Sequence, residues 1–182
     1  SLQVPFPATT ATTPVVVRTS EVDARPASAA ADAWLSEFPR QPVRPVHMDA
    51  GITRLMTDAR SREGNVVSFA DAFPLLLITR AALDDLNARL ARPVSMLQFR
   101  PNLVVDGAAA HAEDGWKRIR IAAVEFEVAK PFMRCLFTTV YPARGEGHPK
   151  LAPLRPLLGY RCPADGVSFS QTLTWRLHGP LR

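Results

Sequence analysis

The residues best suited to chemistry lie in one short segment around a cysteine. Cys135 directly follows Arg134 and lies close to Lys130, in the stretch KPFMRCLFTTV. A nearby cation favours the thiolate form of a cysteine, and a thiolate can act as a nucleophile, carry a persulfide or bind a soft metal. The alternative is a free cysteine that only packs, which is the commoner role of an isolated cysteine. Cys135 is therefore the leading candidate for a reactive group.

A second candidate segment reads FRPNLVV and places Arg100 and Asn102 on either side of Pro101. Proline disfavours the right-handed helical conformation in the residue before it, so Arg100 is expected outside a helix. Arginine is suited to bidentate phosphate binding, and asparagine offers both donors and an acceptor. A surface arginine beside a turn-capping asparagine explains the same residues without any ligand, and it is the simpler interpretation of this segment alone.

The other polar positions favour structural roles. Asp71, in SFADAFP, precedes an apolar run and is interpreted as a turn-forming residue. Cys162 lies in the turn-like sequence RCPADG, and we interpret it as structural. The two cysteines form no CxxC motif, and no Cys/His cluster has zinc-ligand spacing. Because this cysteine density does not match a disulfide-rich secreted domain, we expect a reducing compartment and a cytoplasmic location.

Short strands separated by prolines must position these residues. Strands are predicted at 15–18, 43–48, 75–78, 103–105, 119–121, 124–128, 137–141 and 167–175. Helices are predicted at 27–38 with Ser28 as the N-cap, at 80–90 with Thr79 as the N-cap, and at 154–160. Because strands and helices do not alternate regularly, we expect a mainly β, barrel-like domain with two or three peripheral helices rather than a doubly wound sheet.

Composition limits the class of protein further. The chain has 182 residues, of which 47% are hydrophobic and 21% charged, so it can bury a core and is not a disordered chain. A net charge of +5 favours anionic partners such as phosphate-bearing cofactors or acidic protein faces. Carboxylates interrupt the basic residues, which disfavours a nucleic-acid partner. The longest apolar run, 72–78, is far shorter than the roughly 20 residues of a transmembrane helix, so no membrane span is predicted.

Five stretches in order resemble the MOSC domain, named for the C-terminal domain of molybdenum cofactor sulfurases: SFADAFPLLLIT, AALDDLNARL, FRPNLVVDG, AEDGWKRIRI and KPFMRCLFTTV. The most similar branch contains the mitochondrial amidoxime-reducing component and its bacterial relatives. The resemblance implies a pyruvate-kinase-type β-barrel MOSC domain at 49–182 that lacks its last strand. Residues 1–48 would then be the remnant of a separate N-terminal β-barrel domain and its connecting helix.

The resemblance also implies a function. Cys135 matches the residue that ligates molybdenum and is the expected catalytic residue, and Arg134 matches the arginine beside it. Arg100 and Asn102 match residues that help to hold the phosphate of a molybdenum–pterin cofactor. The implied reaction is the reduction of N-hydroxylated small molecules such as amidoximes and hydroxylamines. Its electrons would come from a separate flavin, iron–sulfur or haem protein.

Two alternatives stay open at this point. Cys135 could carry a persulfide in a sulfur-carrier or cofactor-delivery module. The chain could also be a non-catalytic binding domain, because Tyr141 stands where the resemblance implies an aspartate and Phe132 where a second cysteine is frequent. Molybdenum content and cyanolysable sulfur would distinguish these three hypotheses.

Overall fold

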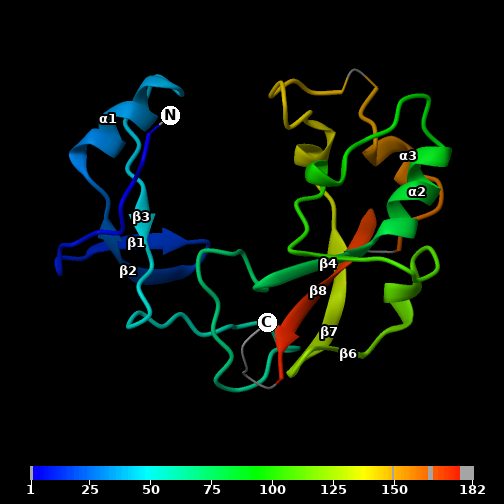
Figure 1. Cartoon of the computed structure of the whole chain (residues 1–182), viewed down its shortest axis with the longest axis horizontal. Helices are drawn as coiled ribbons and strands as arrows, with labels where there is room; N and C mark the ends of the chain where they lie inside the picture. Colours follow the sequence, from blue (N-terminus) through cyan, green and yellow to red (C-terminus); the bar gives the residue numbers. More distant parts are fainter. Residues whose placement is uncertain (1, 149, 164–165, 177–182) are drawn as a thin grey trace. The chain divides into compact units, whose positions relative to one another are not determined.

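The computed structural model describes residues 2–148, 150–163 and 166–176, which form two compact units (Figure 1). The first unit runs from the N-terminus to Thr57 and also includes Val66–Ala72. The second unit contains Asp58–Asn65 and the chain from Phe73 onwards. All four predicted site residues belong to the second unit, so that unit carries the functional argument.

The first unit is a three-stranded antiparallel sheet with one helix. Its strands pair in the order β1 (Thr13–Val17), β2 (Ser20–Pro26) and β3 (Val46–His47). Helix α1 (Ala29–Glu37) begins as predicted, because the Ser28 side chain accepts a hydrogen bond from the backbone N–H of Ala31. The buried Arg54 guanidinium joins the two parts of this unit by donating to the backbone carbonyls of Ser68 and Ala70.

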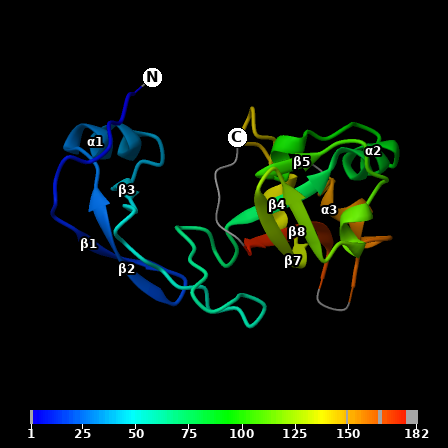
Figure 2. The same cartoon turned by 60° about the horizontal axis from the view of Figure 1, so that its bottom comes forward.

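The second unit is built on a five-stranded, curled sheet with the strand order β5-β4-β8-β7-β6 (Figure 2). Its strands are β4 (Leu75–Thr79), β5 (Leu103–Val105), β6 (Arg118–Ile121), β7 (Val124–Met133) and β8 (Ser168–Trp175). The β4–β5 pair is parallel and the other pairs are antiparallel. With helices α2 (Arg80–Ala88) and α3 (Leu154–Leu158) beside the sheet, the predicted mainly β, barrel-like fold with peripheral helices is confirmed.

Strand β8 lies in the middle of this sheet and is buried on both faces. Two apolar clusters form the core of the unit. One cluster packs α2 and α3 against the sheet and contains Ile78, Ala82, Leu83, Leu86, Val94, Phe99, Leu157, Val167 and Phe169. The other contains Leu77, Val124, Phe126 and Leu173. No helix in the described part of the chain is long and apolar enough to cross a membrane.

The strand predicted at 137–141 is wrong. Leu136–Thr139 instead form a short 3-10 helix that begins directly after Cys135. The Thr138 hydroxyl donates to the backbone carbonyl of Cys135 at 2.9 Å, and the next threonine makes the equivalent bond one residue on at 2.7 Å. Such local bonds from threonine compete with strand pairing, although β-branched residues are otherwise typical of strands. Cys135 thus follows β7 and begins a tight turn, whereas the predicted strand at 137–141 would have placed Cys135 just before a strand.

Candidate functional site

The end of β7 positions Cys135. The pairing of β7 with β8 shifts register on both sides of Pro131, a residue that cannot donate a backbone hydrogen bond. Irregular pairing of this kind bends a strand and changes the direction of the side chains near its end. The Cys135 thiol is free and exposed. A ligand or a partner can therefore reach it.

The Arg134 guanidinium beside it is held by three acceptors from two other segments. Nε donates to the backbone carbonyl of Phe169 at 2.9 Å, and Nη1 donates to the backbone carbonyl of Phe99 at 3.2 Å. Nη2 donates to the hydroxyl of Ser170 at 3.0 Å. Strand β8 and the turn before β5 thus fix the orientation of this cation.

Arg134 is a cation in a poorly solvated place without a carboxylate partner. Burial lowers the pKa of the Arg134 guanidinium to about 9, and the nearby Cys135 opposes this shift, so the group is charged at neutral pH. No carboxylate of the described residues lies within ion-pair distance of Arg134. Two of the five N–H groups of its guanidinium have no acceptor among the described residues. A cation of this kind is stabilised by a negative charge placed beside it.

Arg100 reaches the same region from the turn that precedes β5. Its φ of 52° is left-handed, so Arg100 is outside the right-handed helical region as predicted, although proline usually favours an extended conformation in the residue before it. Its guanidinium lies 5.8 Å above the ring of Phe137, two residues after Cys135. The buried Gln98 amide joins the two turns by donating to the backbone carbonyl of Thr138 at 3.0 Å. The structure therefore brings Arg100, Arg134 and Cys135 to one place.

Asn102 is engaged with the sheet. The side-chain Oδ1 of Asn102 accepts a hydrogen bond from the backbone N–H of Leu76 at 2.8 Å. The backbone N–H of Asn102 donates to the backbone carbonyl of Leu76 at 2.9 Å. These bonds hold the start of β5 against β4, which is a structural role. Its Nδ2 group has no acceptor among the described residues, so this is the part of the side chain that could contact a ligand.

Sequence reasoning missed Ser170. The residue lies within β8, is 1% exposed and has a φ of 93°, a conformation that residues other than glycine rarely adopt. Its hydroxyl and the carbonyl of the preceding Phe169 both accept hydrogen bonds from Arg134. No sequence signal marks it, because Ser170 continues the alternation of its strand. Strained backbone is often retained where it positions a functional group.

Two substitutions should separate the strain at Ser170 from its hydrogen bond. Ser170→Gly and Ser170→Ala both remove the hydroxyl, but only glycine tolerates the positive φ. We therefore expect Ser170→Ala to be less stable than Ser170→Gly by about 1 kcal/mol in urea unfolding. Ser168→Ala, a buried serine of the same strand, serves as the control and should change stability less than Ser170→Ala. Equal free energies of unfolding for the two Ser170 variants would show that the backbone at Ser170 is not strained.

Comparison with known proteins identifies the family. The family model of the MOSC domain matches residues 64–162, which is more than half of the chain. The chain belongs to the MOSC domain family. This match contains Arg100, Asn102, Arg134 and Cys135, and it confirms the resemblance inferred from the sequence motifs. The roles of these residues in binding and catalysis stay predictions.

Several curated proteins that resemble this MOSC chain are named mitochondrial amidoxime-reducing components. It is 37% identical to mitochondrial amidoxime-reducing component 1 of Mus musculus over 145 residues, which are 78% of this chain and 42% of the relative. For component 1 of Homo sapiens the identity is 32% over 164 residues, or 88% and 48%. For component 2 of Homo sapiens it is 42% over 95 residues, or 52% and 28%. The chain thus spans less than half of the length of these relatives.

The other sequence predictions lie outside this cluster of residues. Asp71 belongs to the first unit, where its carboxylate lies 3.7 Å from Arg18. Cys162 is free and exposed. The expected division into a barrel remnant at 1–48 and a MOSC domain at 49–182 without its last strand stays a prediction.

Proposed function

We propose that this MOSC chain binds a molybdenum–pterin cofactor through Cys135 and reduces N-hydroxylated small molecules. The observation that carries the proposal is an exposed cysteine beside a half-buried guanidinium that has no carboxylate partner among the described residues. The relatives are named as amidoxime-reducing components, and that name supports the reaction class. Amidoximes and hydroxylamines are the substrates that we expect.

The residues fit such a cofactor by their chemistry. A thiolate is a good ligand for a soft metal, and the planar guanidinium of arginine can bind a phosphate through two hydrogen bonds. Cys135 would hold the molybdenum, while Arg100, Arg134 and the Nδ2 group of Asn102 would contact the negatively charged pterin phosphate. When bound, the molybdenum supplies oxygen-atom transfer chemistry, with electrons from a separate flavin, iron–sulfur or haem protein.

The protein itself contributes a positive charge in a fixed position and a cysteine that is accessible from solvent. Because Phe99, Phe169 and Ser170 hold the Arg134 guanidinium in one orientation, this charge needs no rearrangement to stabilise an anionic group beside Cys135. The exposure of Cys135 leaves a path for a small molecule from solvent. The MOSC chain thus orients the cofactor and tunes its electrostatics.

The test is metal content. Wild type, Cys135→Ala and Cys162→Ala are produced in a host that makes the cofactor, and molybdenum is measured by elemental analysis together with the fluorescence of the oxidised pterin. Because the metal-binding thiolate is required, we expect about one molybdenum per chain in wild type and in Cys162→Ala, and less than about a tenth of that in Cys135→Ala. Equal molybdenum in Cys135→Ala and wild type would refute the assignment of Cys135.

The exposed thiol beside a cation also favours a second candidate, a persulfide carrier. A cyanolysable sulfur on Cys135 in protein without molybdenum would support that role. If molybdenum, pterin and cyanolysable sulfur are all absent from the wild type, the remaining hypothesis is a non-catalytic binding domain. The same preparations therefore distinguish the three possibilities.

A further inference from the structure

The end of the sheet that bears Cys135 also carries most of the exposed apolar surface of the second unit. Of its seven exposed large apolar residues in the described part of the chain, only Val104 lies elsewhere. The other six are Leu97, Phe132, Leu136, Phe137, Leu151 and Leu158. The two 3-10 helices, Met96–Gln98 and Leu136–Thr139, and α3 pack together here. We name segments 92–101 and 132–158, without residue 149, the Cys135 face.

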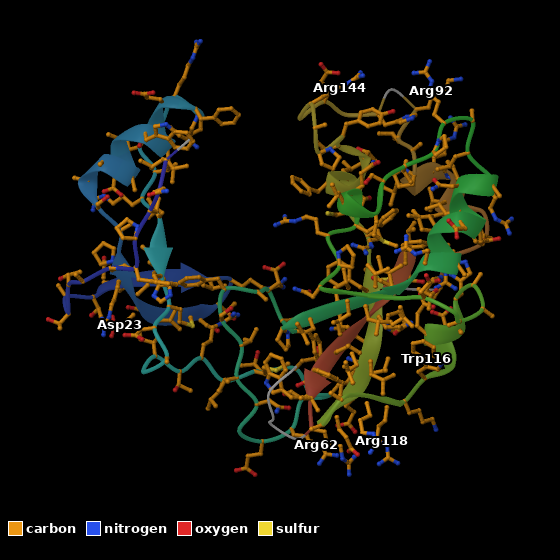
Figure 3. All side chains as sticks on the ribbon, viewed as in Figure 1. Asp23, Arg62, Arg92, Trp116, Arg118 and Arg144 are labelled. Atoms are coloured by element: carbon orange, nitrogen blue, oxygen red, sulfur yellow. The ribbon has the colours of Figure 1, made fainter. Side chains whose placement is uncertain are left out.

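The Cys135 face is also basic, and its cations are unpaired. Its exposed basic residues are Arg92, Arg100, Arg144, Lys150 and Arg155. None of them lies within ion-pair distance of a carboxylate of the described residues. Glu146 is the only acidic residue in the sequence of these two segments. Figure 3 shows Arg92 and Arg144 at the same end of the unit. The face thus combines apolar side chains with a rim of free positive charge.

At the β6 edge of the sheet, by comparison, carboxylates lie among the basic residues. On β6, Arg118 and Arg120 stand across the strand pair from Glu127 and Glu125. Arg62 lies 2.8 Å from Glu127 as well. Figure 3 shows Arg62 and Arg118 together, away from Arg92 and Arg144. The Cys135 face therefore has fewer carboxylates among its basic residues than the β6 edge has.

We propose that the Cys135 face docks a protein partner whose own surface has an acidic rim around an apolar centre. An apolar centre with a charged rim is the usual composition of a protein–protein interface, and opposite charges speed the encounter. Sites for single-stranded nucleic acids typically line a basic groove with stacking aromatic side chains, whereas four of the six apolar residues here are leucines. If the chain has the proposed function, this partner is the electron donor, because the electrons must arrive near Cys135. The identity of the partner therefore rests on the proposed function.

The test uses two acidic electron carriers as probes, a flavodoxin and a [2Fe–2S] ferredoxin, with binding to the whole metal-free chain measured by calorimetry. One triple variant neutralises the face: Arg144→Gln, Lys150→Gln and Arg155→Gln. The matched control makes the same change in net charge at the other edge: Lys117→Gln, Arg118→Gln and Arg120→Gln. Because transient electron-transfer interfaces are small and charge-dependent, we expect binding that weakens with salt and falls about tenfold in the face variant only.

Several outcomes would overturn the proposal. These are equal weakening in both triple variants, no binding of either carrier at low salt, or tighter binding of a single-stranded oligonucleotide than of either carrier. Thermal melting of each variant confirms that it is folded. Because binding is measured without metal, its failure is distinct from a failure of cofactor binding. Carrier binding by a chain that never acquires molybdenum would support the docking face and refute only the proposed function.

Discussion

Arg134→Met should lower the free energy of unfolding by about 3 kcal/mol and abolish cofactor retention. Methionine has a similar length but no donor, so the substitution leaves the Phe99 and Phe169 carbonyls and the Ser170 hydroxyl without their partner. Leaving buried polar groups unpaired costs about 1–3 kcal/mol, and hydrogen bonds to a charged group are at the upper end. Urea unfolding of metal-free protein measures the stability, and elemental analysis measures the cofactor.

Arg134→Lys is the matched comparison for this prediction. Lysine keeps the positive charge but lacks the planar fork, so it cannot bond all three acceptors in their present geometry. We expect it to restore part of the stability and little of the molybdenum. If Arg134→Lys retains as much molybdenum as wild type, the orientation of the guanidinium is unimportant for the cofactor. If Arg134→Met unfolds at the same urea concentration as wild type, the three hydrogen bonds of the Arg134 guanidinium do not stabilise the fold.

The predictions from sequence succeeded where local chemistry decides the structure. Ser28 and Thr79 were expected as N-caps, and each accepts the hydrogen bond of a cap. The prediction of a strand at 137–141 was wrong because it relied on β-branched residues, which are typical of strands. Its threonine hydroxyls bond within the turn instead. Propensity alone cannot decide between these two outcomes.

The candidate site shows the same division. The sequence alone pointed to Cys135 and its neighbouring arginine, because both belong to one short segment. It could not show that the guanidinium contacts Phe169 and Ser170, which are 35 and 36 residues away along the chain. Those contacts depend on the pairing of β7 with β8 and on its irregular register. The positive φ of Ser170 has no sequence signature for the same reason, because it is set by tertiary structure.

A buried carboxylate, Glu113, stabilises the junction of β4 and α2, away from Cys135. Glu113 is 1% exposed, and its two oxygens accept hydrogen bonds from the backbone N–H and the hydroxyl of Thr79, at 3.1 and 2.8 Å. Thr79 ends β4 and caps α2. Glu113→Ala leaves a cavity and removes the acceptor of a buried N–H, so we expect a loss of about 3 kcal/mol in urea unfolding.

Asp114→Asn, one residue further on, is the control for Glu113→Ala. Burial raises the pKa of Asp114, but hydrogen bonds from Arg161 and Gln171 outweigh this effect, so the pKa of Asp114 is below its ordinary value. A lowered carboxylate pKa stabilises the fold at neutral pH, and this contribution disappears as the pH falls through the folded pKa. Because this side chain is 37% exposed, we expect Asp114→Asn to cost less than about 1 kcal/mol at neutral pH.

Together with Arg134→Met, Glu113→Ala separates stability from function. Both substitutions should destabilise the fold to a similar degree, but only Arg134 lies beside Cys135. At a temperature where both variants are folded, Glu113→Ala should keep about the same molybdenum per chain as wild type, because its contacts lie at the β4–α2 junction. If Glu113→Ala loses molybdenum as completely as Arg134→Met, cofactor retention simply follows stability. The specific role assigned to Arg134 would then be wrong.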